Sequence, residues 1–233
     1  MSLNLSVILC LLFSGTCLVL NRPFLEASEK EQHFRAMVFK FLASFCFIII
    51  ATLCFFTEGI GYTRFWRVVA LGLIFGLIGD LLLAFRHIYE KYYELFFGIG
   101  AVSFVLEHFL FIGYFVWVDQ DIIPIATLCF IISFAFATFV LAKTGVKGGR
   151  LQIGIYVYIA IVCLMSATAI STAIKTPSIG SLMFALGSIC FVASDTTICV
   201  YNFSQNKDFK LMILLHYLYY PAQILIALSV MFV

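Results

Sequence analysis

Long apolar runs, separated by short polar stretches, organise this chain from end to end. A helix needs about 20 residues to cross roughly 30 Å of hydrocarbon. Eight runs reach that length to within a few residues, and none shows the period-2 alternation of barrel strands. The pattern predicts an all-α protein with eight transmembrane helices in one domain, residues 1–233. The runs cover approximately residues 3–20, 37–56, 66–85, 95–118, 122–142, 151–174, 178–201 and 211–232.

Composition assigns these helices to a membrane. The chain is 64% hydrophobic and 11% charged, whereas soluble domains carry about 25% charged residues. We therefore expect a multi-pass integral membrane protein whose partners are membrane lipids, with no nucleic acid and no obligate protein partner. The first run lacks a basic leader and a small-residue cleavage site, so we expect it to remain as a span.

Basic residues predict the orientation. Of the 14 Lys and Arg residues, only Arg64, Arg67 and Lys175 lie on the side reached after even-numbered runs. Positive charge marks the cytoplasmic side, so both termini should be extracytoplasmic. A bacterial plasma membrane is the favoured location, and a eukaryotic endomembrane is the alternative. The other side holds Arg22, Lys30, Arg35, Lys40, Arg86, Lys91, Lys143, Lys147, Arg150, Lys207 and Lys210.

Two carboxylates lie inside apolar runs, Asp80 in "GLIGDLLLAF" and Asp195 in "FVASDTTICVYNF". A charge at the centre of a membrane helix costs about 2.5–3.5 kcal/mol on insertion scales, so such a group is usually paired or functional. Both lie six or seven residues before a polar run end, which predicts similar depth in the cytoplasmic half. Gly79 and Ser194 precede them and would permit close helix approach.

A shift of 115 residues relates the two acids. It lays "ALGLIFGLIGD" (70–80) over "ALGSICFVASD" (185–195) and His108 over Gln223. We interpret this as a duplication that gives two parallel four-helix repeats, related by an axis along the membrane normal. One acid from each half would then meet its partner near that axis.

Brought close, Asp80 and Asp195 could not both ionise easily, and one carboxyl would stay protonated. The pair would then supply an acid and a base from two identical side chains. The alternative is that each is a structural buried acid bonded to Ser, Thr or Tyr.

Other polar residues in the runs could support such a site. His108 follows Glu107, and because helix neighbours point about 100° apart, at most one should face the acids. Lys40 could snorkel to the membrane surface or reach a lipid phosphate. Tyr156 and Tyr158 are either interface aromatics or supporting site residues. A polar stripe in the last run, spaced at i, i+3, i+4 and i+7, is formed by His216, Tyr219, Tyr220 and Gln223.

Motifs for metal and nucleophilic chemistry are absent from the sequence. The four His residues form no HExxH motif and no i, i+4 pair; a zinc ion held by His108, His216 and the acids is the alternative. The eight Cys residues contain no CxxC pair, so we expect small core residues rather than disulfides. We expect no metal and no cofactor.

Four elements in order, "GLIFGLIGDLLLAF", "FGIGAVSFVLEHFLFIGY", "LGSICFVASDTTICV" and "YYPAQILIALS", give the chain a resemblance to the YhhN-like lysoplasmalogenase family. The resemblance covers most of the chain beyond residue 36. It implies an eight-span fold and hydrolysis of the vinyl ether bond of lysoplasmalogens, which releases a fatty aldehyde and a glycerophospho-ethanolamine or -choline. By position, the family's site residues correspond to Asp80, Asp195, His108, Tyr220, Gln223 and Lys40, although "KFL" replaces the Lys-Pro usual at the last position.

From these observations we expect an ether hydrolase in which Asp80 and Asp195 are catalytic and act on a lysophospholipid substrate. The supporting or substrate-binding residues would be Lys40, His108, Tyr156, Tyr220 and Gln223. Vinyl ethers hydrolyse through protonation of a carbon, and a desolvated carboxylic acid is a suitable donor. The alternative function is a transporter of lipids or small molecules, with the buried acids as a proton or substrate site.

Overall fold

The computed structural model describes residues 3–58, 63–205 and 208–232, and this part of the chain contains eight long helices. All eight are long and apolar enough to span a membrane, which confirms the predicted spans. The first helix extends nine residues past its predicted end because the polar segment after residue 20 continues it. The helices are α1 (Leu3–Glu29), α2 (His33–Glu58), α3 (Thr63–Ile88), α4 (Tyr93–Val118), α5 (Ile123–Lys143), α6 (Gln152–Lys175), α7 (Ile179–Phe203) and α8 (Phe209–Ser229).

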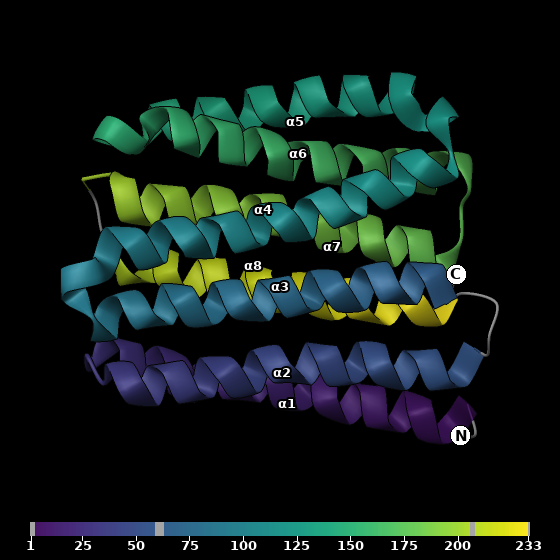
Figure 1. Ribbon diagram of the computed structural model, residues 1–233, viewed down its shortest axis with the longest axis horizontal. Coiled ribbons are helices and arrows are strands. Elements are labelled where there is room, and N and C mark those ends of the chain that lie inside the picture. Colours follow the sequence, from purple (N-terminus) through teal and green to yellow (C-terminus); the bar gives the residue numbers. More distant parts are fainter. Residues whose placement is uncertain (1–2, 59–62, 206–207, 233) are drawn as a thin grey trace.

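The helices run alongside one another in a layered bundle (Figure 1). The α1–α2 hairpin forms one edge and the α5–α6 hairpin forms the other, with α3, α4, α7 and α8 between them. The two chain ends lie at the same end of the bundle, as an even number of crossings requires (Figure 1). Odd-numbered helices end, and even-numbered helices begin, at the opposite end, which we call the basic end. Its assignment to the cytoplasm stays a prediction, and Lys207 lies outside the described residues.

The interior interfaces pair α2 with α8 and α4 with α6. Under the 115-residue shift, α2 corresponds to α6 and α4 corresponds to α8. A two-fold axis that relates the two halves of the chain would therefore convert one of these interfaces into the other. The duplication itself stays a prediction.

Glycine brings α7 and α8 into backbone contact. A Cβ atom at Gly187 would lie 2.8 Å from the Ala222 carbonyl oxygen, and one at Gly180 would lie 2.6 Å from that of Ser229. Both distances are shorter than van der Waals contact, so only glycine allows this approach. The packing holds the helix that carries Asp195 against the helix that carries the polar stripe.

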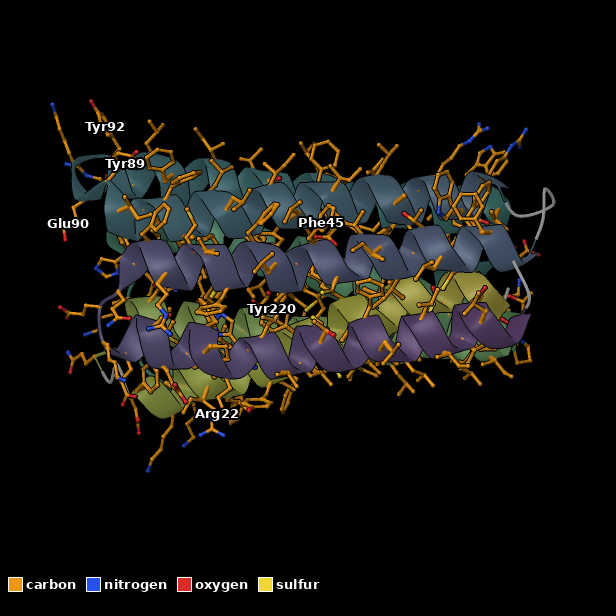
Figure 2. All side chains as sticks on the ribbon, turned by 90° about the horizontal axis from the view of Figure 1, so that it is seen from below. Arg22, Phe45, Tyr89, Glu90, Tyr92 and Tyr220 are labelled. Atoms are coloured by element: carbon orange, nitrogen blue, oxygen red, sulfur yellow. The ribbon has the colours of Figure 1, made fainter. Side chains whose placement is uncertain are left out.

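Large aromatic rings contribute to the centre of the bundle, and apolar side chains, both aliphatic and aromatic, cover its outside. Phe47, Phe111, Phe184, Phe191 and Tyr220 are fully buried, and Figure 2 shows Tyr220 between helices while Arg22 projects from the surface. Many Leu and Ile side chains are exposed, as expected of a surface that faces lipid. None of the eight cysteines forms a disulfide, and six of them are buried.

Candidate functional site

One cavity brings the two intramembrane acids together. It has a volume of about 290 Å³, and its wall includes Asp80 from α3 and Asp195 from α7. Both carboxyl groups are buried in the protein. Most of the remaining wall is apolar, with Phe97, Phe104 and other hydrocarbon side chains. The expected meeting of the acids in a shared space is observed, and we call this space the inner cavity.

Asp80 has the contacts of an ionised carboxylate. Lys40 Nζ lies 3.0 Å from its Oδ1. Its other oxygen, Oδ2, accepts hydrogen bonds from Ser44 Oγ at 2.5 Å and from the Tyr219 hydroxyl at 2.8 Å. An ionised carboxylate only accepts, and its two oxygens here meet one cation and two hydroxyl donors. Lys40 is itself buried and points inward, so the interpretation that it snorkels to the surface is wrong.

Asp195 has a different environment. Its Oδ2 accepts a hydrogen bond from the Tyr158 hydroxyl of α6. His108 Nε2 lies 3.8 Å from the same oxygen, which is too long for a hydrogen bond. The preceding residue, Ser194, donates to the Leu215 carbonyl at 3.1 Å and ties α7 to α8 at this level. No Lys or Arg forms an ion pair with Asp195 among the described residues.

The two acids are held in a crossed arrangement. Asp80 is contacted from α2, the preceding helix of its own half, and from α8, the last helix of the other half. Asp195 is contacted from α6 and from α4, which are the corresponding helices. Any movement of the halves would therefore change the contacts of both acids together.

A third carboxyl group belongs to this network. Glu107 Oε1 accepts a hydrogen bond from Gln223 Nε2 at 3.0 Å, and the same nitrogen lies 3.3 Å from the Tyr219 hydroxyl that bonds Asp80. Glu107 thus joins the network of Asp80, while His108 lies beside Asp195. Both side chains are directed toward the acids, so the expectation that at most one would be is wrong. Their 100° separation directs His108 toward α7 and Glu107 toward α8.

Gly76 makes room for this network. A Cβ atom at Gly76 would lie 2.9 Å from Glu107 Oε2 and 3.0 Å from Gln223 Nε2. Both are closer than Cβ atoms normally approach polar atoms, so a larger residue would displace one of the two side chains. Gly76, which lies one helical turn before Asp80 on α3, is thus part of the site.

Several expected site residues lie behind the cavity rather than on its wall. His108 and Gln223 contact the acids or their neighbours without lining the cavity. Tyr220 packs against Tyr219, with ring centroids 5.4 Å apart, and does not line it either. Tyr156 of α6 does not line the inner cavity. It packs in the cluster between α5, α6 and α7, and Tyr158 reaches Asp195 instead.

The inner cavity reaches the lipid-facing surface between α4 and α6. Val102 of α4 and Val157 of α6 line it and are 57% and 53% exposed. The small residues Gly98, Ala101 and Gly154 lie on the same wall. An apolar chain in the bilayer would meet the cavity at this opening.

A second cavity of about 400 Å³, the outer cavity, lies at the basic end. The two cavities adjoin, because both are lined by Lys40, Leu83, Ile198, Leu215 and His216. His216 Nδ1 lies 2.8 Å from the Met212 carbonyl oxygen. Within the part of the chain that the structure describes, no group of three or more His, Cys, Asp and Glu side chains is placed to hold a metal ion.

Comparison with known proteins shows the family to which the chain belongs. Searches of curated proteins and of solved structures returned no significant match. The family model described as the YhhN family matches residues 35–230. That range contains both acids, their contacts on four helices and nearly the whole bundle, so the chain belongs to the YhhN family.

Proposed function

We propose that this protein hydrolyses the vinyl ether bond of lysoplasmalogens, in keeping with the lysoplasmalogenase activity that its family membership suggests. The observation that carries the proposal is the inner cavity. It is mainly apolar, it opens between α4 and α6, and it holds two buried carboxyl groups with unequal contacts. A single-chain ether lipid would place its hydrocarbon along this wall and its reactive bond beside the acids.

Because their contacts differ, Asp80 and Asp195 have different roles in the proposed reaction. Asp80, opposite Lys40, is the permanent carboxylate. Asp195, without a Lys or Arg counter-charge among the described residues, is the proton donor. Because both face one cavity, an acid and a base are available to one bound molecule, as in other carboxyl pairs whose environments differ.

In this scheme the Asp195 carboxyl transfers its proton to the β-carbon of the vinyl ether. The double-bond electrons form the new C–H bond, and the α-carbon becomes part of an oxocarbenium ion. The two carboxylates then stabilise that cation. Water adds to the α-carbon and returns a proton to Asp195, which gives a hemiacetal. The hemiacetal breaks its bond to the glycerol oxygen as its hydroxyl proton moves to that oxygen, releasing aldehyde and glycerophospholipid.

Tyr158 and His108 act on Asp195 as positioning residues. Tyr158 fixes one carboxyl oxygen by its hydrogen bond, which leaves the other oxygen available toward the cavity. His108 Nε2 lies 3.8 Å from the oxygen that Tyr158 contacts, and its ring packs at a steep angle against Phe191, with ring centroids 4.8 Å apart. Both would favour one rotamer of Asp195.

The experiment incubates purified protein with lysoplasmenyl-ethanolamine and, as a control, with its saturated alkyl-ether analogue. We expect free aldehyde from the first lipid alone, because only a vinyl ether forms an oxocarbenium ion on protonation. Asp195→Asn, which keeps the volume but has no transferable acid proton, should produce none. Absence of aldehyde, together with lipid or solute flux in proteoliposomes, would replace the hydrolase by the transporter.

A further inference from the structure

The outer cavity has a buried cation that the proposed chemistry does not use. Arg86, at the end of α3, is only 6% exposed and lines this cavity. Its Nε donates to His87 Nε2 at 3.1 Å, and its guanidinium lies 5.2 Å from the ring centroids of both Tyr93 and Phe97. Its buried Nη1 has no hydrogen-bond partner, and Arg86 takes part in no ion pair among the described residues.

Such a group needs an anion. Burial removes the hydration of this guanidinium, and its hydrogen bond to His87 replaces only part of it. The two aromatic rings hold its position through cation–π contacts but cannot accept the Nη1 hydrogen bonds. A fixed guanidinium with free donors suits planar or tetrahedral oxyanions, and phosphate above all.

The remaining wall fits the same ligand. Lys40 lines the cavity with Arg86, as do the imidazoles of His33 and His87, which stack with centroids 5.7 Å apart. The carboxylates Glu29 and Glu31 also line it but are exposed. The cations Lys40 and Arg86 thus lie deep in the cavity, and the carboxylates lie at its rim. A zwitterionic headgroup would match this arrangement, with its phosphate deep in the cavity and its ammonium group at the rim.

Glu31 supports this reading of the rim. It adopts φ 55° in the turn between α1 and α2, a left-handed conformation that favours glycine. The Glu31 side chain also lines the outer cavity.

We propose that the outer cavity is a binding site for the phosphodiester of a zwitterionic lysophospholipid headgroup, with Arg86 as its principal ligand. The proposal rests on the proposed function for the identity of the lipid, but the phosphate site stands on Arg86 and its cavity. Lys40 joins the two cavities, since it lines both and pairs with Asp80. With the phosphate at Arg86, the short glycerol backbone would carry the ether oxygen through this junction to the acids.

The test measures binding of a lipid that cannot be cleaved. Purified protein in detergent is titrated with a saturated 1-alkyl lysophosphoethanolamine and with the matching 1-alkylglycerol, which lacks phosphate. We expect the parent to bind the phospholipid at least tenfold more tightly. Arg86→Met, which keeps an apolar stem beside the two rings, should remove that preference, and Arg86→Lys should retain part of it. Charge-assisted bonds to phosphate justify a loss of about 10- to 100-fold.

The matched control is Arg22→Met. Arg22 is also a helix-borne arginine, but it is exposed and pairs with Glu26 at 3.0 Å. The Arg22→Met variant should bind both lipids as tightly as the parent does. Equal binding of the phospholipid by folded Arg86→Met and the parent would overturn the proposal. Inorganic phosphate is also added as a competitor. If phosphate displaces the phospholipid when both are present at the same concentration, the cavity is a free-phosphate site instead. Because no cleavage is measured, an inactive enzyme would leave these results unchanged.

Discussion

Neutralising Asp80 should lower the stability of the protein as well as its activity, because Lys40 would remain in the bundle without its counter-charge. At the observed 3.0 Å separation, Coulomb attraction at an effective dielectric constant of 20 is about 5.5 kcal/mol. Desolvation offsets part of this, and breaking a buried pair by removing one partner typically costs about 3–5 kcal/mol. Asp80→Asn should therefore unfold at a clearly lower temperature in detergent.

The double variant separates this charge effect from the loss of packing. Lys40→Met leaves Asp80 unpaired and should also destabilise the protein, whereas Lys40→Met with Asp80→Asn removes both buried charges. We expect the double variant to recover most of the lost unfolding temperature while turnover of the vinyl ether lipid stays undetectable. General acid–base and electrostatic contributions of about 10²–10⁴-fold justify the loss of turnover.

A surface pair supplies the control. Lys175 lies 3.3 Å from Asp119, and the two side chains are 28% and 29% exposed. Lys175→Met should cost no more than about 1 kcal/mol. If Asp80→Asn unfolds at the parental temperature and the double variant is less stable than either single variant, the ion pair is not buried as described. Our assignment of Asp80 as the permanent carboxylate would then fail.

Four further predictions test other parts of the site. Asp195→Asn should abolish turnover, whereas Tyr158→Phe should reduce kcat by about tenfold, because it removes one hydrogen bond to Asp195. Gly76→Ala should lower both stability and turnover by displacing the Glu107 side chain, while Gly113→Ala, with open space around it, should not. Gly154→Trp should raise KM for the lipid by obstructing the opening between α4 and α6, with Gly113→Trp as the control, measured by initial rates. A reporter fused to the C-terminus should be extracytoplasmic, as the 11 to 3 distribution of basic residues requires.

The number, type and approximate limits of the helices follow from the sequence because hydrocarbon imposes one solution on the backbone. Every polar backbone group must be satisfied within a span, so an apolar run of the right length becomes a helix. The similar depth of the acids is predicted for the same reason, since rise along a helix converts sequence distance into depth. The structure shows that Asp80 and Asp195 line one cavity, and their depth in the membrane stays a prediction.

Rotation of each helix about its axis could not be predicted in the same way. Runs that are apolar on every face have no periodicity to show which side turns inward. The sequence therefore does not distinguish Tyr156 from Tyr158 as the tyrosine that reaches Asp195, and it does not show that Glu107 turns toward Gln223. A second carboxyl group beside His108 was a signal in its own right, since an intramembrane acid is rarely without a function or a partner.

If the two halves of the chain arose by the duplication that we predict, single differences between the halves account for the unequal surroundings of the acids. Under the 115-residue shift, Lys40 corresponds to Ile155, and both line the inner cavity. The shift likewise sets Phe104 against Tyr219, of which only the tyrosine can donate to an acid, and both line the same wall. The half that contains Asp195 thus offers a hydrocarbon side chain where the other offers an ammonium group. In the reaction that we propose, this difference in surroundings would keep Asp80 charged and leave Asp195 able to carry a proton, so that one cavity offers both a base and an acid.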